Sequence, residues 1–324
     1  MTTPVLSIRN LSVEIPTRAG VVKPVDGVSY DIAKGEILGV VGESGAGKSM
    51  AGNAVIGLLN PPAHISAGEI HLNGNRIDPL RGEAMRKLRG KEIGMIFQDP
   101  LTSLNPLLTI GNQLTETMLT HLPISQKEAD ERAVAALEEV GIPGAAERID
   151  SYPHEFSGGM RQRVVIALAL CAEPSLVIAD EPTTALDVSV QAQITALLKR
   201  LCRERGTAVM LITHDMGVIA ETADRVAVMY AGRLAELGTV REVLTAPEHP
   251  YTHGLMASTP LASQGRRRLH QIPGSMPRLT MMPEGCAFHP RCPRAQDKCR
   301  HAPGPVKGTG RAACWLPMVA EAAE

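Results

Sequence analysis

Apolar and polar residues alternate along two stretches near the start of the chain, Leu6 to Ile15 and Val21 to Ile32. This period of two predicts two strands, each with one buried face. The next apolar run, Ile37 to Val41, does not alternate and predicts a strand buried on both faces, followed by a helix from Lys48 to about Leu59. Shorter apolar segments predict further strands at Glu69 to Leu72 and Ile93 to Gln98.

Helical periodicity dominates the middle of the chain, from Pro106 to Gly141, and is clearest at Ala129 to Val140. Ser157 is a suitable N-cap for a long helix that runs to about Ala172. Because strands and helices then alternate, the pattern predicts an α/β fold with a largely parallel core sheet. These later elements are a strand at Leu176 to Ala179, a helix at Val188 to Glu204 and a strand at Val209 to Thr213.

The character of the sequence changes near Ala246. Before this point, Arg225 to Leu237 predicts a hairpin and Val240 to Leu244 a short helix. After it lie eleven of the 24 prolines and four of the six cysteines. The change predicts two domains: residues 1–245, in which a helical subdomain is expected at about 101–160 from the helical periodicity and the family resemblance described below, and a small Cys- and Pro-rich domain at 246–324.

Charge and composition argue against several classes of protein. The net charge of -1 provides no field that would attract a nucleic-acid backbone, so no nucleic-acid partner is expected. The N-terminus lacks the continuous apolar region of a secretory signal. The longest apolar stretch, Val164 to Ala172, is far shorter than the roughly 20 residues that cross a bilayer. We therefore expect a chain that stays in the cytosol and does not itself cross the membrane.

A glycine-rich segment between the strand at 37–41 and the following helix matches the phosphate-binding pattern G-x-x-x-x-G-K-[ST]. Backbone N–H groups in such a loop and at the helix N-terminus suit phosphate oxygens. Lys48 is expected to reach the terminal phosphates of ATP, and the Ser49 hydroxyl to bind Mg²⁺. The predicted nucleotide-binding residues of this phosphate loop are Gly42, Glu43, Ser44, Gly45, Ala46, Gly47, Lys48 and Ser49.

Two carboxylates end the apolar strand at 176–179. Asp180 suits the Mg²⁺ side of the site, and Glu181 is placed to polarise the water that attacks the terminal phosphate. Because the carboxyl ends of parallel strands meet at one edge of a sheet, both are expected at the edge where the phosphate loop emerges.

The segment Phe156 to Arg163, FSGGMRQR, resembles the signature of ABC ATPases, which most P-loop proteins lack. The resemblance implies a RecA-like core, a helical subdomain and a head-to-tail dimer in which this segment covers the ATP bound by the partner subunit. Ser157, Gly158 and Gly159 would contact that nucleotide, since a helix N-terminus binds anions. Met160 stands where Gln is commoner, a departure shared with peptide-importer ATPases.

Other landmarks of the family follow in the expected order. The resemblance implies that Gln98 senses Mg²⁺ and the permease, that Asp187 communicates across the dimer and that His214 contacts the terminal phosphate. Gln98, Glu181 and His214 are thus the expected catalytic residues, with Ser49, Gln98 and Asp180 around Mg²⁺. Ile15 stands where many ABC proteins carry an aromatic ring against adenine, which predicts base recognition that is either weaker or differently built.

Three further segments narrow the resemblance to the ATPases of dipeptide, oligopeptide and nickel importers: Met95 to Pro106, His249 to Tyr251 and Gly285 to Pro293. This resemblance implies a peripheral ATPase at the cytoplasmic face of the cell membrane that powers peptide import. Its partners would be a second ABC ATPase subunit (a copy or a paralogue), two permease subunits whose loops contact the insert at 101–152, and an extracytoplasmic binding protein. The alternatives are another cargo, such as nickel or glutathione, and a soluble non-transport ABC ATPase.

Four cysteines in the Pro-rich tail form a second candidate site: Cys286, Cys292, Cys299 and Cys314. Thiols grouped in a cytosolic segment without an obvious core predict a metal centre, either a [4Fe-4S] cluster or a tetrahedral zinc. Zinc ligands usually come in C-x2-4-C pairs, which this tail lacks, so the spacing favours the cluster. Similar importer ATPases include members with a cluster, and thiols without metal are the third alternative.

Overall fold

The computed structural model describes residues 3–184, 186–259, 271–305 and 311–318, and the chain divides into two compact units. The first unit comprises Met1–Leu6, Ile32–Ile37 and Pro79–Leu211, and the second comprises Ser7–Asp31, Leu38–Asp78 and Ile212–Glu324. The second unit therefore holds both the phosphate loop and the C-terminal segment. The domain boundary predicted near Ala246 lies within it and stays a prediction.

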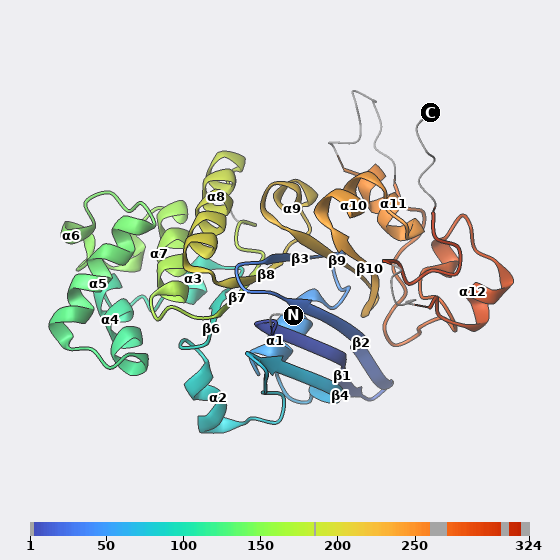
Figure 1. Cartoon of the computed structure of the whole chain (residues 1–324), viewed down its shortest axis with the longest axis horizontal. Helices are drawn as coiled ribbons and strands as arrows, with labels where there is room; N and C mark the ends of the chain where they lie inside the picture. The colour runs from blue at the N-terminus through green and yellow to red at the C-terminus, as the bar shows by residue number, and fades with distance from the viewer. Residues whose placement is uncertain (1–2, 185, 260–270, 306–310, 319–324) are drawn as a thin grey trace. The chain divides into compact units, whose positions relative to one another are not determined.

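Helices make up most of the first unit. They are α2 (Gly82–Leu88), α3 (Pro100–Ser103), α4 (Ile110–His121), α5 (Gln126–Glu139), α6 (Ala145–Arg148), α7 (Gly158–Leu170) and α8 (Val188–Arg205). Figure 1 shows α4, α5, α6 and α7 packed as one group. Three of these helices begin at a hydroxyl N-cap whose side chain accepts the backbone N–H of the residue three positions later. These caps are Thr109, Ser125 and, as predicted, Ser157.

Three strands of the first unit lie side by side in the order β8-β7-β6: β6 (Ile93–Ile96), β7 (Leu176–Asp180) and β8 (Ala208–Ile212). β6 and β7 are parallel, and Ile96 pairs with Ala179. The residues that follow these two strands therefore leave the sheet at the same edge. This register places the glutamine and the carboxylates predicted from the sequence next to one another.

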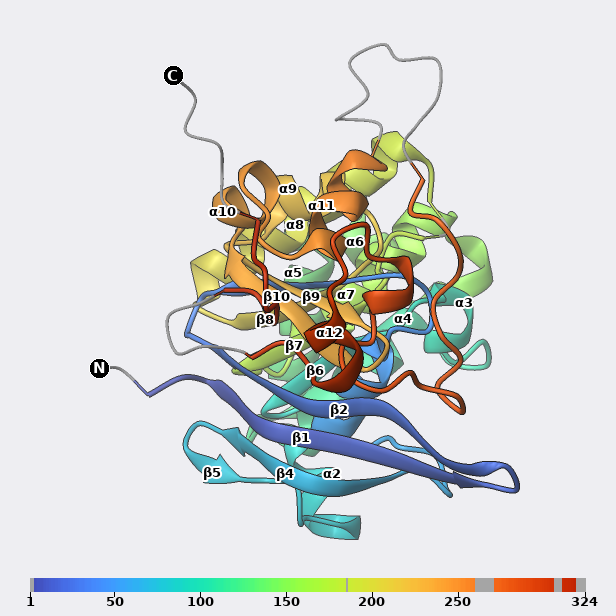
Figure 2. The same cartoon turned by 90° about the vertical axis from the view of Figure 1, so that its right-hand side faces the viewer.

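The second unit begins with a four-stranded sheet in the order β2-β1-β4-β5, which Figure 2 shows edge to edge. Its strands are β1 (Leu6–Thr17), β2 (Gly20–Ile32), β4 (His64–Leu72) and β5 (Asn75–Arg76). The alternation at the start of the sequence correctly predicted β1 and β2. Their inward positions, such as Ile8, Leu11 and Val28, are fully buried.

A second group of strands in this unit carries the phosphate loop: β3 (Ile37–Val41), β9 (Arg225–Tyr230) and β10 (Arg233–Thr239). β3 is parallel to β9, and β9 and β10 form the predicted antiparallel hairpin, so the pairing is mixed. The helices are α1 (Lys48–Val55), α9 (Met216–Thr222), α10 (Val240–Thr245), α11 (Pro250–Ala257) and α12 (Asp297–His301), with a 3-10 helix at His289–Arg291. Among the described residues, no helix is long and apolar enough to cross a bilayer.

Two element ends differ from the prediction. α1 ends at Val55 rather than near Leu59, because Gly57 has a φ of 68° and the N–H of Leu58 donates to the carbonyl of Asn53. This is a Schellman ending, in which a left-handed glycine stops the helix. β6 ends at Ile96 rather than Gln98, and the chain then turns into α3.

The C-terminal segment has a core that the sequence did not reveal. Tyr251 and Phe288 are buried, and their rings lie 5.4 Å apart. Both contact Tyr230 of β9, at centroid distances of 4.6 Å and 5.2 Å. The aromatic rings of the tail therefore pack in a cluster that the tail shares with the β9–β10 hairpin, rather than in a core of its own.

Candidate functional site

The phosphate loop follows β3 and adopts a backbone that only glycine tolerates at its ends. Gly42 has a φ of 149° and Gly47 a φ of 99°. A Cβ atom on Gly47 would lie 1.9 Å from the carbonyl oxygen of Pro24, and one on Gly42 would lie 2.2 Å from that of Met229. The sequence thus folds here into a tight loop that ends at the first residue of α1, as a phosphate cradle requires.

Lys48 lies at the start of α1 and is only 6% exposed. Its Nζ donates to the carbonyl oxygens of Gly42, at 2.9 Å, and Glu43, at 3.2 Å. The ammonium group is thus held within the loop, where it can pair with phosphate oxygens. Ser49, the predicted Mg²⁺ ligand, is exposed on the first turn of the same helix.

His214 belongs to the same unit as the phosphate loop. The N–H of Thr213 donates to the carbonyl of Val40 in β3, 3.2 Å away, so His214 follows at the carboxyl end of β3 where the loop begins. Its side chain is exposed. The second unit thus brings the phosphate loop and this predicted catalytic histidine to one edge.

The first unit brings together the predicted carboxylates and glutamine. Nε2 of Gln98 donates to Oε2 of Glu181 at 3.1 Å, and Asp180 precedes Glu181 at the end of β7. Oγ1 of Thr184 donates to the same Glu181 oxygen at 2.8 Å. Glu181 has a φ of 47°, which is costly for a residue other than glycine and typical of functional sites. Thr184 was not predicted, because its contact depends on the turn that gives Glu181 its positive φ.

The signature segment lies beside the start of α8. Oγ of Ser157 accepts the N–H of Met160, and Oδ1 of Asp187 accepts that of Val190 at 2.9 Å. A Cβ atom on Gly159 would lie 2.8 Å from the Val190 side chain, so glycine allows the two helix starts to approach. Gly158 and Ser157 are exposed at the N-terminus of α7, where the unpaired N–H groups of a helix attract an anion.

Residues of the C-terminal segment contact the phosphate loop, which sequence reasoning did not predict. The N–H of Glu43 donates to Oη of Tyr251 at 2.9 Å. Nη1 of Arg291 lies 3.0 Å from both carboxylate oxygens of Glu43. The residue types gave no signal for these contacts, because they join positions about 200 to 250 apart in the chain.

The four cysteines of the tail line one small cavity of about 20 Å³. All six cysteines of the chain are free thiols. Burial raises the pKa of Cys286, Cys292 and Cys314 above the usual thiol range, and neighbouring cysteines add to this. Among the described residues, no three His, Cys, Asp or Glu side chains are already placed to hold a single metal ion. Thiols are the donor type that zinc and iron–sulfur centres use, and the N–H of Leu316 donates to Sγ of Cys314 at 3.3 Å.

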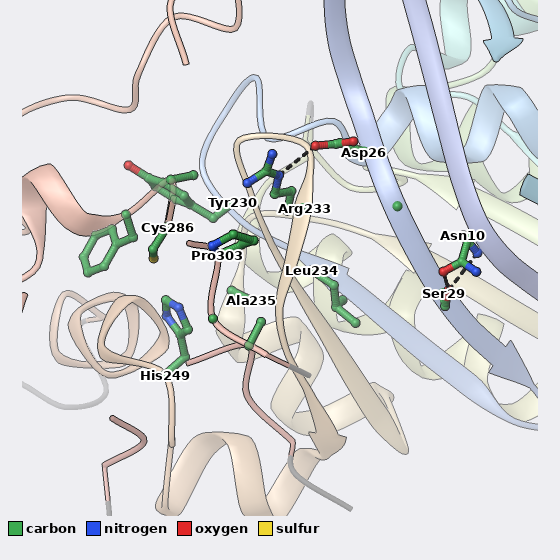
Figure 3. A pocket seen from close by; sticks show the side chains of 15 residues that line it. Asn10, Asp26, Ser29, Tyr230, Arg233, Leu234, Ala235, His249, Cys286 and Pro303 are labelled. Carbon is green, nitrogen blue, oxygen red and sulfur yellow. Dashed lines mark hydrogen bonds and ion pairs between the residues drawn. The ribbon is translucent and has the colours of Figure 1, made fainter. Parts of the chain in front are cut away.

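A larger cavity of about 400 Å³ adjoins the cysteines, and Figure 3 shows Cys286, His249, Arg233 and Asp26 around it. Nε of Arg233 donates to Oδ2 of Asp26 at 2.7 Å, and its Nη1 donates to the carbonyl of Gly285 at 3.2 Å. Arg233 thus ties the start of the cysteine segment to β2. Cys286 lines both cavities.

Two segments of the chain match known protein families, and relatives of similar length are known. Residues 25–184 match the family described as ABC transporter, and residues 235–299 match the oligopeptide/dipeptide transporter, C-terminal region. The oligopeptide transport ATP-binding protein OppD of Bacillus subtilis (strain 168) is 52% identical over 288 residues, covering 88% of this chain and 80% of that protein. The dipeptide transport ATP-binding protein DppD of the same strain is 48% identical, covering 96% and 94%.

A solved structure is also similar. The ATP-binding cassette MJ0796, described as a dimer in a post-hydrolysis state bound to ADP and Pi, aligns with a TM-score of 0.65 and 28% identity. The alignment covers 73% of this chain and 99% of that one.

Proposed function

Because the chain belongs to the ABC transporter ATP-binding proteins, in the group with the oligopeptide/dipeptide transporter C-terminal region, we propose that it binds and hydrolyses ATP to drive import of peptides. The match of residues 235–299 carries the peptide assignment, since a phosphate loop alone is common to many ATPases. The identity of about half of all positions with peptide-transport ATPases supports the same cargo class over nickel or glutathione.

In the proposed reaction, the phosphate loop and Lys48 hold the nucleotide phosphates. Ser49, Gln98 and Asp180 would hold Mg²⁺, an ion that would supply positive charge to the phosphates. Glu181 accepts a proton from, or orients, the attacking water, and His214 contacts the terminal phosphate. The hydrogen bond between Gln98 and Glu181 supports a shared task for these two side chains.

Exposed groups of the first unit support the proposed partners. The exposed N-terminus of α7, with Ser157, Gly158 and Gly159, is suited to the ATP of a second ABC subunit in a head-to-tail dimer, and Asp187 lies beside it. The insert at 101–152 exposes four large apolar side chains: Leu101, Leu107, Leu119 and Tyr152. Two permease subunits would dock there and hold the ATPase at the cytoplasmic face of the membrane. An extracytoplasmic binding protein would deliver the cargo.

The domain assignment belongs to this proposal. Residues 1–245 would form the ABC ATPase domain, with a RecA-like core and a helical subdomain at about 101–160, and residues 246–324 the C-terminal domain. The grouped helices α3 to α7 support the subdomain.

We further propose that Cys286, Cys292, Cys299 and Cys314 hold a [4Fe-4S] cluster, with zinc as the alternative. The shared cavity and the absence of disulfides support this donor set. Such a centre would offset the cost of burying the thiolates and would order the Pro-rich segment.

The substitution Glu181→Gln tests the proposed reaction. It removes the base but leaves the phosphate loop intact, so ATP binding should persist while hydrolysis falls by about 10²-fold or more. Hydrolysis should be measured with the permease subunits and binding protein in vesicles, with and without peptide. The matched control Glu204→Gln, on the exposed face of α8, should hydrolyse ATP normally. Normal turnover in Glu181→Gln would contradict its role, and wild-type hydrolysis that peptide does not stimulate would contradict peptide import.

A further inference from the structure

Arg291 joins the C-terminal segment to the phosphate loop through a shielded ion pair. Its Nη1 lies 3.0 Å from both Oε1 and Oε2 of Glu43, the second residue of the loop. The Arg291 side chain is only 7% exposed and that of Glu43 28%. Salt screens such a pair much less than it screens charges on an open surface. The contact can therefore fix the position of Glu43.

The backbone of the same loop residue is held as well. The N–H of Glu43 donates to Oη of Tyr251 at 2.9 Å, and Tyr251 is fully buried at the start of α11. Burial raises the pKa of Tyr251, so its hydroxyl stays protonated. Both the main chain and the side chain of Glu43 are thus fixed by residues that follow position 246.

Arg291 is also held in place by hydrogen bonds to residues other than Glu43. Its Nε donates to the carbonyl of Pro273 at 2.9 Å, and its Nη1 donates to Oη of Tyr230 at 3.2 Å. Met276, three residues after Pro273, lies beside the loop. The Cε atom of Met276 is 3.2 Å from the position that a Cβ atom on Gly45 would take. The guanidinium group is preorganised, so little entropy is lost on pairing.

We propose that Arg291 is a positioning residue of the ATP site. Through Glu43 it holds the phosphate loop in the conformation that binds nucleotide phosphates, so the C-terminal segment sets the ATP affinity. Backbone N–H groups bind phosphate only when they converge. Glycine loses more conformational freedom on ordering than any other residue, so contacts that hold this glycine-rich loop in place lower the entropy cost of binding. The inference rests on the proposed function, since it concerns the same ATP site.

The test is ATP·Mg²⁺ affinity of the full-length chain, measured by calorimetric titration, with turnover at saturating ATP measured alongside. Arg291→Gln removes the charge-assisted contact and should weaken ATP binding about tenfold, with little change in kcat because Glu181 and His214 are untouched. Glu43→Gln should weaken binding similarly. The double variant should be no weaker than either single one, because both remove the same contact. Arg291→Lys should recover part of the affinity.

Arg311→Gln is the matched control. Arg311 also lies in the C-terminal segment, but its Nη2 pairs with Glu248 at 2.6 Å, so this variant should bind ATP like the wild type. Unchanged affinity in both Arg291→Gln and Glu43→Gln, or an equal loss in Arg311→Gln, would overturn the inference. If Arg291→Gln does not fold, as judged by its melting temperature, Glu43→Gln decides the matter. A wild-type chain that binds no ATP would instead refute the proposed function.

Discussion

Lys48 is a charged residue in a nearly water-free position, and its surroundings explain why it is there. The residue is only 6% exposed, and its ammonium group donates to two loop carbonyls. Burying a charge is costly unless polar groups compensate, and the loop carbonyls are among the groups that do so here. A bound triphosphate would supply the opposite charge, so we expect this lysine to contribute strongly to nucleotide affinity.

Lys48→Ala should therefore weaken ATP binding by about 10- to 100-fold, because a charge-assisted hydrogen bond in a buried site is lost. Hydrolysis at low ATP should fall at least as much. Titration of the purified chain with ATP and Mg²⁺ measures the effect, and Lys87→Ala, at an exposed position of α2, is the control. ATP affinity equal to that of the control would show that Lys48 does not bind the phosphates.

At the scale of residues, the sequence predicts motifs that are contiguous in the chain but not contacts that depend on folding. The spacing of Gly42 to Ser49 and the pair Asp180 and Glu181 could be predicted because each is contiguous in the chain. The hydrogen bond from Thr184 to Glu181 could not, since it depends on the turn that gives Glu181 its positive φ. The contact of Arg291 with Glu43 depends on tertiary packing alone.

At the scale of elements, α11 shows how one buried side chain fixes a helix start. His249 is its N-cap, and Nδ1 accepts the N–H of Tyr251 at 3.0 Å. Only a neutral imidazole can accept this bond, and burial lowers the pKa of His249 from 6.5 to about 4. Because Tyr251 also holds Glu43, the protonation state of this cap bears on the loop.

The pKa of His249 predicts a pH dependence of stability. Between pH 6.5 and about 4 the unfolded chain binds a proton at this residue that the folded chain does not, so the free energy of unfolding falls as pH falls through this window. The full loss is about 3 kcal/mol at low pH and is absent above pH 7. His249→Asn keeps a capping acceptor without a titrating group, so its unfolding in urea should depend less on pH than that of the wild type.

His253→Gln is the control for this measurement, because His253 is an exposed histidine of the same helix. Its stability should follow the wild type from pH 7 to pH 4. An identical pH slope in His249→Asn and the wild type would show that His249 does not produce the effect.

Elements near strong local signals were predicted well, and those that depend on distant partners were not. The alternation of β1 and β2 and the Ser157 cap of α7 are local features, and both were correct. The helix α11 was missed, although Pro250 at its first position is a typical start. Its stability comes from burial of Tyr251 against Phe288 and Tyr230, which no window of sequence contains.

At the scale of the whole molecule, the second unit brings the cysteine segment into contact with the phosphate loop, although the two lie far apart in the chain. Arg291 contacts the phosphate loop, and Cys292 follows it directly. Phe288, between Cys286 and Arg291, is buried in the aromatic cluster around Tyr230. A change in what the cysteines hold would therefore act on the residues that support the ATP site.

Cys292→Ser tests this link together with the metal centre. Anaerobically purified wild-type chain should be brown and contain about four irons and four labile sulfides, and the variant should lose both colour and iron. Because Arg291 then loses its neighbouring anchor, ATP affinity should fall in the same direction as in Arg291→Gln. Cys202→Ser, in α8 of the first unit, should retain the iron. Stoichiometric zinc without iron would contradict the cluster and support the zinc site. A wild-type chain with neither iron nor zinc would contradict both kinds of metal centre. A Cys292→Ser variant that retains all its iron would show that Cys292 is not a ligand.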